Sequence, residues 1–186
     1  MSPILGTLAS QFSGKPFSSF ESIATVTVGS GGSSNIEFTS IPSTYKHLQL
    51  RGIARTPDSS NVFFQFNSDT GSNYNYMNLT GNGSVVENYG AASQNNILFG
   101  KSNYSASNSS MFATTICDIL EYASTNKNKA IKSLVGADTN GGAGQSVGVL
   151  SGLWRNASAI TSIKLFPSSG IFNQYSQFAL YGIKGA

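Results

Sequence analysis

The chain has little charge and almost no cysteine. Only 10% of its 186 residues are Asp, Glu, Lys or Arg, against about 25% in typical soluble domains. Its single cysteine, Cys117, excludes an intramolecular disulfide and a multi-cysteine zinc site. The thiol lies in the apolar run MFATTICDILEY, which indicates a buried small side chain rather than a reactive group. No apolar run approaches the length of a membrane span, so we expect no membrane partner.

The cationic side chains are scattered along the sequence. Lys127, Lys129 and Lys132 form the only local group. Binding of nucleic acid through its phosphates needs several clustered cations, so we expect no nucleic-acid partner. The start of the chain, MSPILGTLASQFSG, has neither the cationic beginning nor the continuous apolar core of a secretory signal. We therefore expect synthesis in a cytoplasm.

Short β-branched and aromatic runs, separated by Gly, Ser, Asn and Pro, fill the chain after residue 20. No segment shows a helical period with caps. In the second run Ile36 and Phe38 should point inward, and in the fourth Val62, Phe64 and Phe66 should share one face. The pattern predicts an all-β fold, an antiparallel β-sandwich that is jelly-roll-like. The expected strands are 23–28, 35–41, 47–54, 61–67, 76–80, 84–87, 96–100, 111–122, 129–138, 147–154, 159–166 and 176–183.

Two segments near the N-terminus carry separate expectations. The run GSGGSS at 29–34 supplies glycines for positive φ, as a tight hairpin between the first two strands requires. Residues 1–20 are apolar in patches but interrupted by glycine and proline, so they predict an extended arm for attachment or assembly, followed by a sandwich domain at 21–186. The candidate assembly contacts of the arm are Ile4, Leu5, Leu8, Phe12, Phe17 and Phe20.

No catalytic motif is present in the sequence. The one histidine, His47, opens an expected strand, and no GxSxG element accompanies it. Asp118 falls within an apolar strand, where a carboxylate needs a partner, and a salt bridge or a hydrogen bond explains it more simply than catalysis. We therefore expect a protein that is not an enzyme, with a hydrolase as a remote alternative.

The loop FNSDTGSNY at 66–74 resembles a calcium loop only faintly. A calcium site uses several oxygen ligands with two or more carboxylates, whereas this loop offers Asp69 alone. Asx-type turns, in which Asn and Asp side chains accept hydrogen bonds from nearby backbone amides, account for the same residues. We expect no metal and no cofactor.

Four aromatic side chains are weak candidates for glycan contacts. Tyr74, Tyr76, Tyr89 and Trp154 could form a platform for a sugar ring, flanked by asparagine amides. The competing interpretation is that the alternate tyrosines pack in the core or cover the edges of sheets. The sequence favours this second interpretation.

Three segments carry a family resemblance. SIPSTYKHLQLRGIAR at 40–55, FNSDTGSNYNYMNLTGNGS at 66–84 and SQFALYGIKG at 176–185 resemble small virion proteins of tailed bacteriophages, in which "IPxTYKHLxLR", "FNxDTGxNY" and "LYGIK" elements recur in that order. The resemblance spans most of the chain after residue 20 and carries no catalytic signature. It implies a structural role in the virion, as a decoration, fibre or tail-associated protein.

The resulting expectation is a non-enzymatic structural protein of a tailed-phage virion, most simply an exterior capsid decoration subunit of cement or fibre-like type. Its expected partners are copies of itself, with a trimer as one arrangement, and the major capsid protein or another virion protein. The alternative is a carbohydrate-binding receptor module of a tail or head fibre, with host surface glycans as its ligands.

Overall fold

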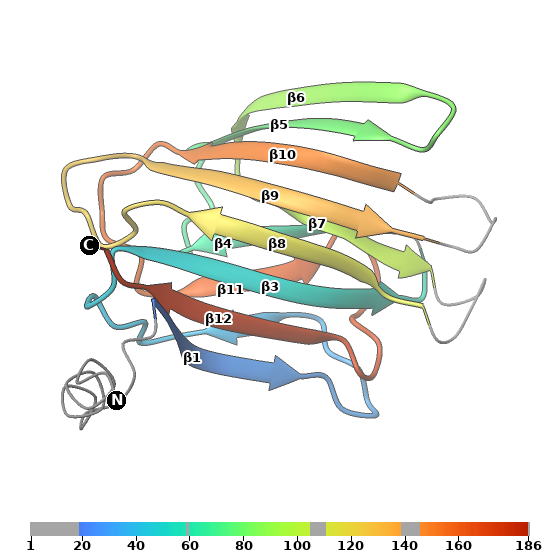
Figure 1. Cartoon of the computed structure of the whole chain (residues 1–186), viewed down its shortest axis with the longest axis horizontal. Coiled ribbons are helices and arrows are strands. Elements are labelled where there is room, and N and C mark those ends of the chain that lie inside the picture. The colour runs from blue at the N-terminus through green and yellow to red at the C-terminus, as the bar shows by residue number, and fades with distance from the viewer. Residues whose placement is uncertain (1–18, 59, 105–110, 139–145, 186) are drawn as a thin grey trace, which may run out of the picture.

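The computed structural model describes residues 19–58, 60–104, 111–138 and 146–185, and every regular element in these ranges is a β-strand. The strands form two antiparallel sheets, one in front of the other (Figure 1). Across the large sheet the order is β1 (Phe20–Thr27), β12 (Gln177–Ile183), β3 (His47–Thr56), β8 (Ala113–Ile119), β9 (Lys129–Ala137), β10 (Ser146–Trp154), β5 (Tyr74–Gly81) and β6 (Val86–Gln94). The small sheet contains β2 (Ile36–Phe38), β11 (Ile163–Pro167), β4 (Ser60–Phe66) and β7 (Ile97–Tyr104), and a short parallel pairing of β7 with β3 joins the two sheets. The predicted all-β antiparallel sandwich is confirmed.

Alternation along the strands fills the space between the sheets. Val62, Phe64 and Phe66 of β4 are fully buried, and Ile36 and Phe38 of β2 are buried as well, so both predicted inward faces are confirmed. The Phe64 and Phe66 rings lie with their centroids 4.9 Å apart. Such pairs stabilise a core beyond the area that they bury.

Eight of the strands pair in a nested order. β1 pairs with β12, β2 with β11, β3 with β8 and β4 with β7, all antiparallel. The remaining strands form two antiparallel hairpins, β5–β6 and β9–β10, which lengthen the large sheet beyond β8. The large sheet is therefore wider than the small one, and its far edge is β6.

Two expectations near the N-terminus need correction. The run at 29–34 does not make a hairpin, because β1 pairs with β12 and β2 with β11; it carries the chain from one sheet to the other, with Gly32 at φ 70°. Phe20 belongs to β1 rather than to an arm, since it pairs with Ile183. The other five candidate arm contacts lie outside the described residues.

Candidate functional site

The loop between β4 and β5 is organised by the carboxylate of Asp69. Its Oδ1 accepts a hydrogen bond from the Gly71 amide at 2.8 Å, and its Oδ2 accepts from Asn73 Nδ2 at 2.9 Å and from Trp154 Nε1 at 2.8 Å. Burial acts to raise the pKa of Asp69, but the hydrogen bonds from Trp154, Asn73 and Gly71 outweigh it and lower this pKa below its ordinary value. The expected Asx-type turn is confirmed at Asp69.

Tyr74 closes the same loop from within the core. Its hydroxyl accepts from the Phe66 amide at 3.0 Å and donates to the Asp69 carbonyl at 3.1 Å. Its ring stacks on Trp154, with the centroids 6.3 Å apart and the planes 17° from parallel. Burial raises the pKa of Tyr74. Both oxygens of the carboxylate and the phenol are therefore directed at partners inside the protein.

Asn67 extends this network to the connection before β11. Its Oδ1 accepts from the Thr161 and Ser162 amides at 2.8 and 3.1 Å, and its Nδ2 donates to the Ala159 carbonyl at 2.7 Å. Asn67 has a positive φ of 51°, a backbone conformation that asparagine tolerates better than most residues. The amide-rich loop thus fastens a long-range connection, which is a structural role.

The four candidate glycan contacts do not form one exposed platform. Tyr74 and Trp154 are fully buried, so neither presents a ring face to a ligand, and their assignment as glycan contacts is wrong. Tyr76 is partly buried and packs against Tyr89 at 6.2 Å between centroids. Tyr89 alone of the four is largely exposed, at 58%.

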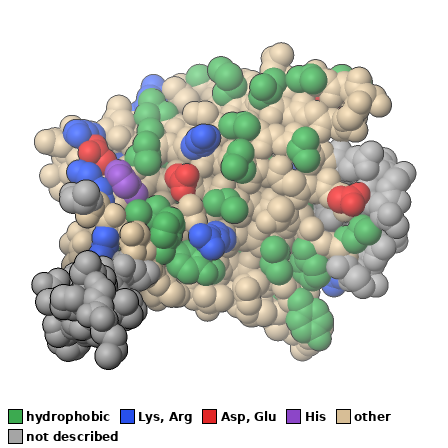
Figure 2. Space-filling view, viewed as in Figure 1, with side chains coloured by type: hydrophobic (Ala, Val, Ile, Leu, Met, Phe, Trp, Pro, Cys, Tyr) green, Lys and Arg blue, Asp and Glu red, His purple; other side chains and the backbone are tan. Residues whose placement is uncertain are grey.

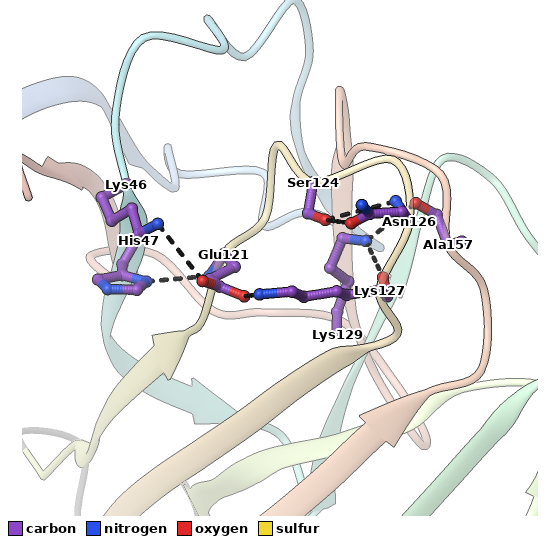
Figure 3. Close-up of polar contacts among 8 residues, drawn as sticks. All are labelled: Lys46, His47, Glu121, Ser124, Asn126, Lys127, Lys129 and Ala157. Carbon is purple, nitrogen blue, oxygen red and sulfur yellow. Dashed lines mark hydrogen bonds and ion pairs between the residues drawn. The ribbon is translucent and has the colours of Figure 1, made fainter.

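A second polar cluster lies in the turn after β8 (Figure 3). The carboxylate of Glu121 contacts Lys127 Nζ at 2.7 Å and Lys46 Nζ at 3.4 Å, while the backbone amide of Glu121 donates to His47 Nδ1 at 2.9 Å. The hydrogen bonds from Lys127 and Lys46 lower the pKa of Glu121. His47 thus accepts a backbone hydrogen bond at the turn, in agreement with its structural interpretation.

Lys129 is the buried cation of this region. Its ammonium donates to the backbone carbonyls of Lys127 at 2.5 Å and Ala157 at 3.2 Å (Figure 3), and the residue is fully buried. Burial lowers the pKa of Lys129. One backbone carbonyl before β9 and one after β10 therefore accept hydrogen bonds from this side chain. The positions of the lysines along the sequence did not predict that Lys129 would be buried and would donate to backbone carbonyls.

The remaining chemical candidates also have structural explanations. Cys117 is buried, and this burial raises its pKa to about 12, which agrees with the prediction of an inert thiol. Asp118 accepts a hydrogen bond from Gln49 Nε2 at 2.8 Å across the sheet, as the simpler interpretation expected. Within the described ranges no three His, Cys, Asp or Glu side chains lie together as a metal site would need.

Comparison with known proteins adds no family: no family model and no curated protein matches the chain. No helix in the described part of the chain is long and apolar enough to cross a membrane. The surface feature that the sequence did not reveal is a group of exposed apolar side chains on the outer face of the large sheet (Figure 2).

Proposed function

We propose that this chain is a structural protein of a tailed-phage virion, an exterior capsid decoration subunit without enzymatic activity. The observation that carries the proposal is the nested pairing of eight strands. With the β5–β6 and β9–β10 hairpins set aside, the sheets have the orders β1-β12-β3-β8 and β2-β11-β4-β7. This order resembles that of a jelly roll, an architecture of viral capsid proteins and lectins, and so supports the proposal.

The chemistry of the most distinctive loop supports a structural role. In the phage proteins that the sequence resembles, the "FNxDTGxNY" element recurs, and here its Asp, Asn and Tyr side chains hold the loop, Trp154 and the core together. Contacts of this kind stabilise a fold rather than catalyse a reaction. The low charge of the chain also suits a subunit packed among many copies, where like-charge repulsion would accumulate.

The proposal is tested on particles made by the phage or prophage genome that encodes the chain. Purified particles should contain the chain at a fixed ratio to the major capsid protein, and added protease or antibody should reach it on intact particles. Particles from a strain that lacks the gene should still assemble but lose their DNA at a lower temperature. A chain that stays in the lysate and is absent from gradient-purified particles contradicts the proposal.

A carbohydrate-binding module is the second candidate, and the exposed ring of Tyr89 favours it. By strand alternation Tyr89 shares a face of β6 with Glu87, which lines a pocket of about 200 Å³ together with Lys101 and the buried Ser146. An exposed ring beside polar groups is the arrangement that a sugar needs. Binding on a glycan array that is lost in Tyr89→Ala, with an unchanged melting temperature, would establish it. Absence of binding by the wild-type chain would remove this candidate.

A further inference from the structure

The outer face of the large sheet carries a continuous row of apolar side chains. Ile116, Leu134, Val149 and Leu79 come from β8, β9, β10 and β5, and each lies directly opposite the next in the strand register. All four side chains are exposed. Directly opposed residues in antiparallel strands share a face, so these side chains are neighbours across four strands without a polar residue between them.

A second row runs parallel to the first, two residues along each strand. It reads Ile53, Thr114, Gly136, Val147, Gly81 and Val86 from β3 to β6. The two glycines leave an open groove of about 640 Å³ between the protruding side chains of both rows. We call the apolar side chains of the two rows, together with Met77, the outer apolar face.

A polar row borders the outer apolar face on its other side. Gln49, Asp118, Lys132 and Ser151 lie opposite one another from β3 to β10 in the next register position. This row contains one acid and one base. An apolar centre with a polar border is the composition of a protein–protein interface.

The size of this surface exceeds what a lone subunit usually exposes. Val86, Val147 and Met77 are 72%, 68% and 63% exposed. The eight apolar residues of the face together expose on the order of 700 Å², above the roughly 300–600 Å² of the largest patch on a typical monomer and close to the ~800 Å² that each partner gives to a standard interface. Figure 2 shows hydrophobic side chains spread over the strands that face the viewer, with a few charged side chains among them.

We propose that the outer apolar face binds a second copy of this chain across a two-fold axis. Two sheets pack well face to face when both present interlocking aliphatic side chains, and two copies of one face provide matching surfaces by symmetry. Charge opposes the pairing little, because the net charge of each copy is only +3 and the two apolar rows contain no charged residue. Arg51 of β3 lies directly opposite Ile116 at the end of the first row, and its guanidinium lies over the Phe20 and Tyr181 rings. In the polar row each copy has one negative charge, on Asp118, and one positive charge, on Lys132, and each can pair with the opposite charge of the partner copy.

The proposal rests on the surface itself and not on the virion role. A dimer that never enters particles would contradict the virion role and leave this proposal intact. A monomer found in particles would support the virion role and contradict this proposal.

The test is sedimentation equilibrium on the full-length chain, up to about 100 μM, which lies above the micromolar upper end of dissociation constants for standard interfaces. The variants are Leu134→Glu, at the centre of the apolar row, and Leu79→Lys on a different strand. The matched control is Leu120→Glu, because Leu120 is similarly exposed, at 47% against 54% for Leu134, but lies beyond the end of β8. Trp154 fluorescence and the melting temperature report that each variant folds.

We expect a dimer whose dissociation constant rises at least about 100-fold in Leu134→Glu and in Leu79→Lys, since a two-fold axis introduces each charge twice. The control should stay within about threefold of the wild type. The proposal is overturned if the wild type is a monomer or a trimer. It is also overturned if both variants fold and still form the dimer. A last variant lacks residues 1–18. If the wild type is a monomer and this variant forms a dimer, the outer apolar face is covered by the chain's own N-terminal segment and not by a second copy.

Discussion

Replacement of Asp69 by alanine should destabilise the protein far more than its position in a surface loop suggests. The carboxylate accepts hydrogen bonds from the Gly71 amide, the Asn73 amide and the Trp154 indole, at distances from 2.8 to 3.2 Å. The indole belongs to a fully buried residue, and its N–H donates to the Asp69 carboxylate. Asp69→Ala therefore leaves a buried donor without an acceptor.

The magnitude follows from the partners that are lost. An unsatisfied buried donor costs about 1–3 kcal/mol, and the loss of the charge-assisted bonds in the loop adds to it, so we expect a total of about 2–4 kcal/mol. For a chain of 186 residues, each kcal/mol lowers the melting temperature by about 2–4 °C, which gives a drop of roughly 5–15 °C. Asp69→Asn keeps one acceptor oxygen and should lose about half as much.

The assay is thermal and urea unfolding followed by fluorescence, because Trp154 is the only tryptophan and reports directly on the site. Asp58→Ala is the matched control, since Asp58 is an exposed aspartate in a turn, and its substitution should change the unfolding free energy by less than about 0.5 kcal/mol. If Asp69→Ala melts within about 2 °C of the wild type, the carboxylate does not hold the indole and the structural reading of the loop is refuted.

Four further predictions concern titration, metal and the N-terminal segment. The stability that Asp69 adds should be present above its ordinary pKa of 3.8 and be lost as the pH falls through its lowered folded-state pKa. The difference in unfolding free energy between the wild type and Asp69→Asn, measured by urea titration, should therefore disappear at acid pH. Lys129 has its pKa lowered in the folded state, so the unfolding free energy of the wild type should rise relative to Lys129→Met as the pH climbs toward 10.5; a flat difference contradicts this. Chelator should leave the melting temperature within about 2 °C, and a larger drop that calcium reverses would show a metal site. Deletion of residues 1–18, which spares β1, should leave a folded domain that no longer joins particles, whereas unfolding of this variant would assign the segment to the core.

The sequence predicted the strands well because their signals are local. All twelve expected strands exist, and most bounds agree within three residues. The largest difference is β6, expected at 84–87 and found at Val86–Gln94. Its sequence VENYGAASQ has few β-branched residues and forms a strand because β5 pairs with it along most of its length. Pairing with a neighbour therefore overrides weak propensity at this edge.

Strand partners could not be predicted in the same way. The glycine-rich run at 29–34 indicated a hairpin, yet β1 pairs with β12 at the other end of the chain. A local turn signal reports that the chain can bend, whereas the choice of partner depends on long-range contacts in the core. Tyr74 and Trp154 were wrong as glycan candidates for a related reason, because a tyrosine or tryptophan in a strand has the same sequence signal whether its face is inside or outside.

The outer apolar face was hidden because β10 carries apolar side chains on both of its faces. Leu150 and Trp154 point inward together with Gly148 and Gly152, while Val147 and Val149 point outward. A sequence rule that places apolar residues in the core cannot choose between two such faces. Close packing decides the choice, because a Cβ at Gly148 would lie 2.5 Å from Thr80 Cγ2.

A Cβ at Gly152 would likewise lie 2.6 Å from Ile97 Cδ1, so the inward side of β10 has no room for larger side chains at either glycine. The valines then occupy the outward side, where in an isolated sandwich they would contribute little to stability and add a risk of aggregation. Their exposure is unfavourable only while that side faces water. A second copy packed against it would turn the outward side of β10 into an interior, and apolar residues on both sides are the pattern expected of a strand buried on both faces.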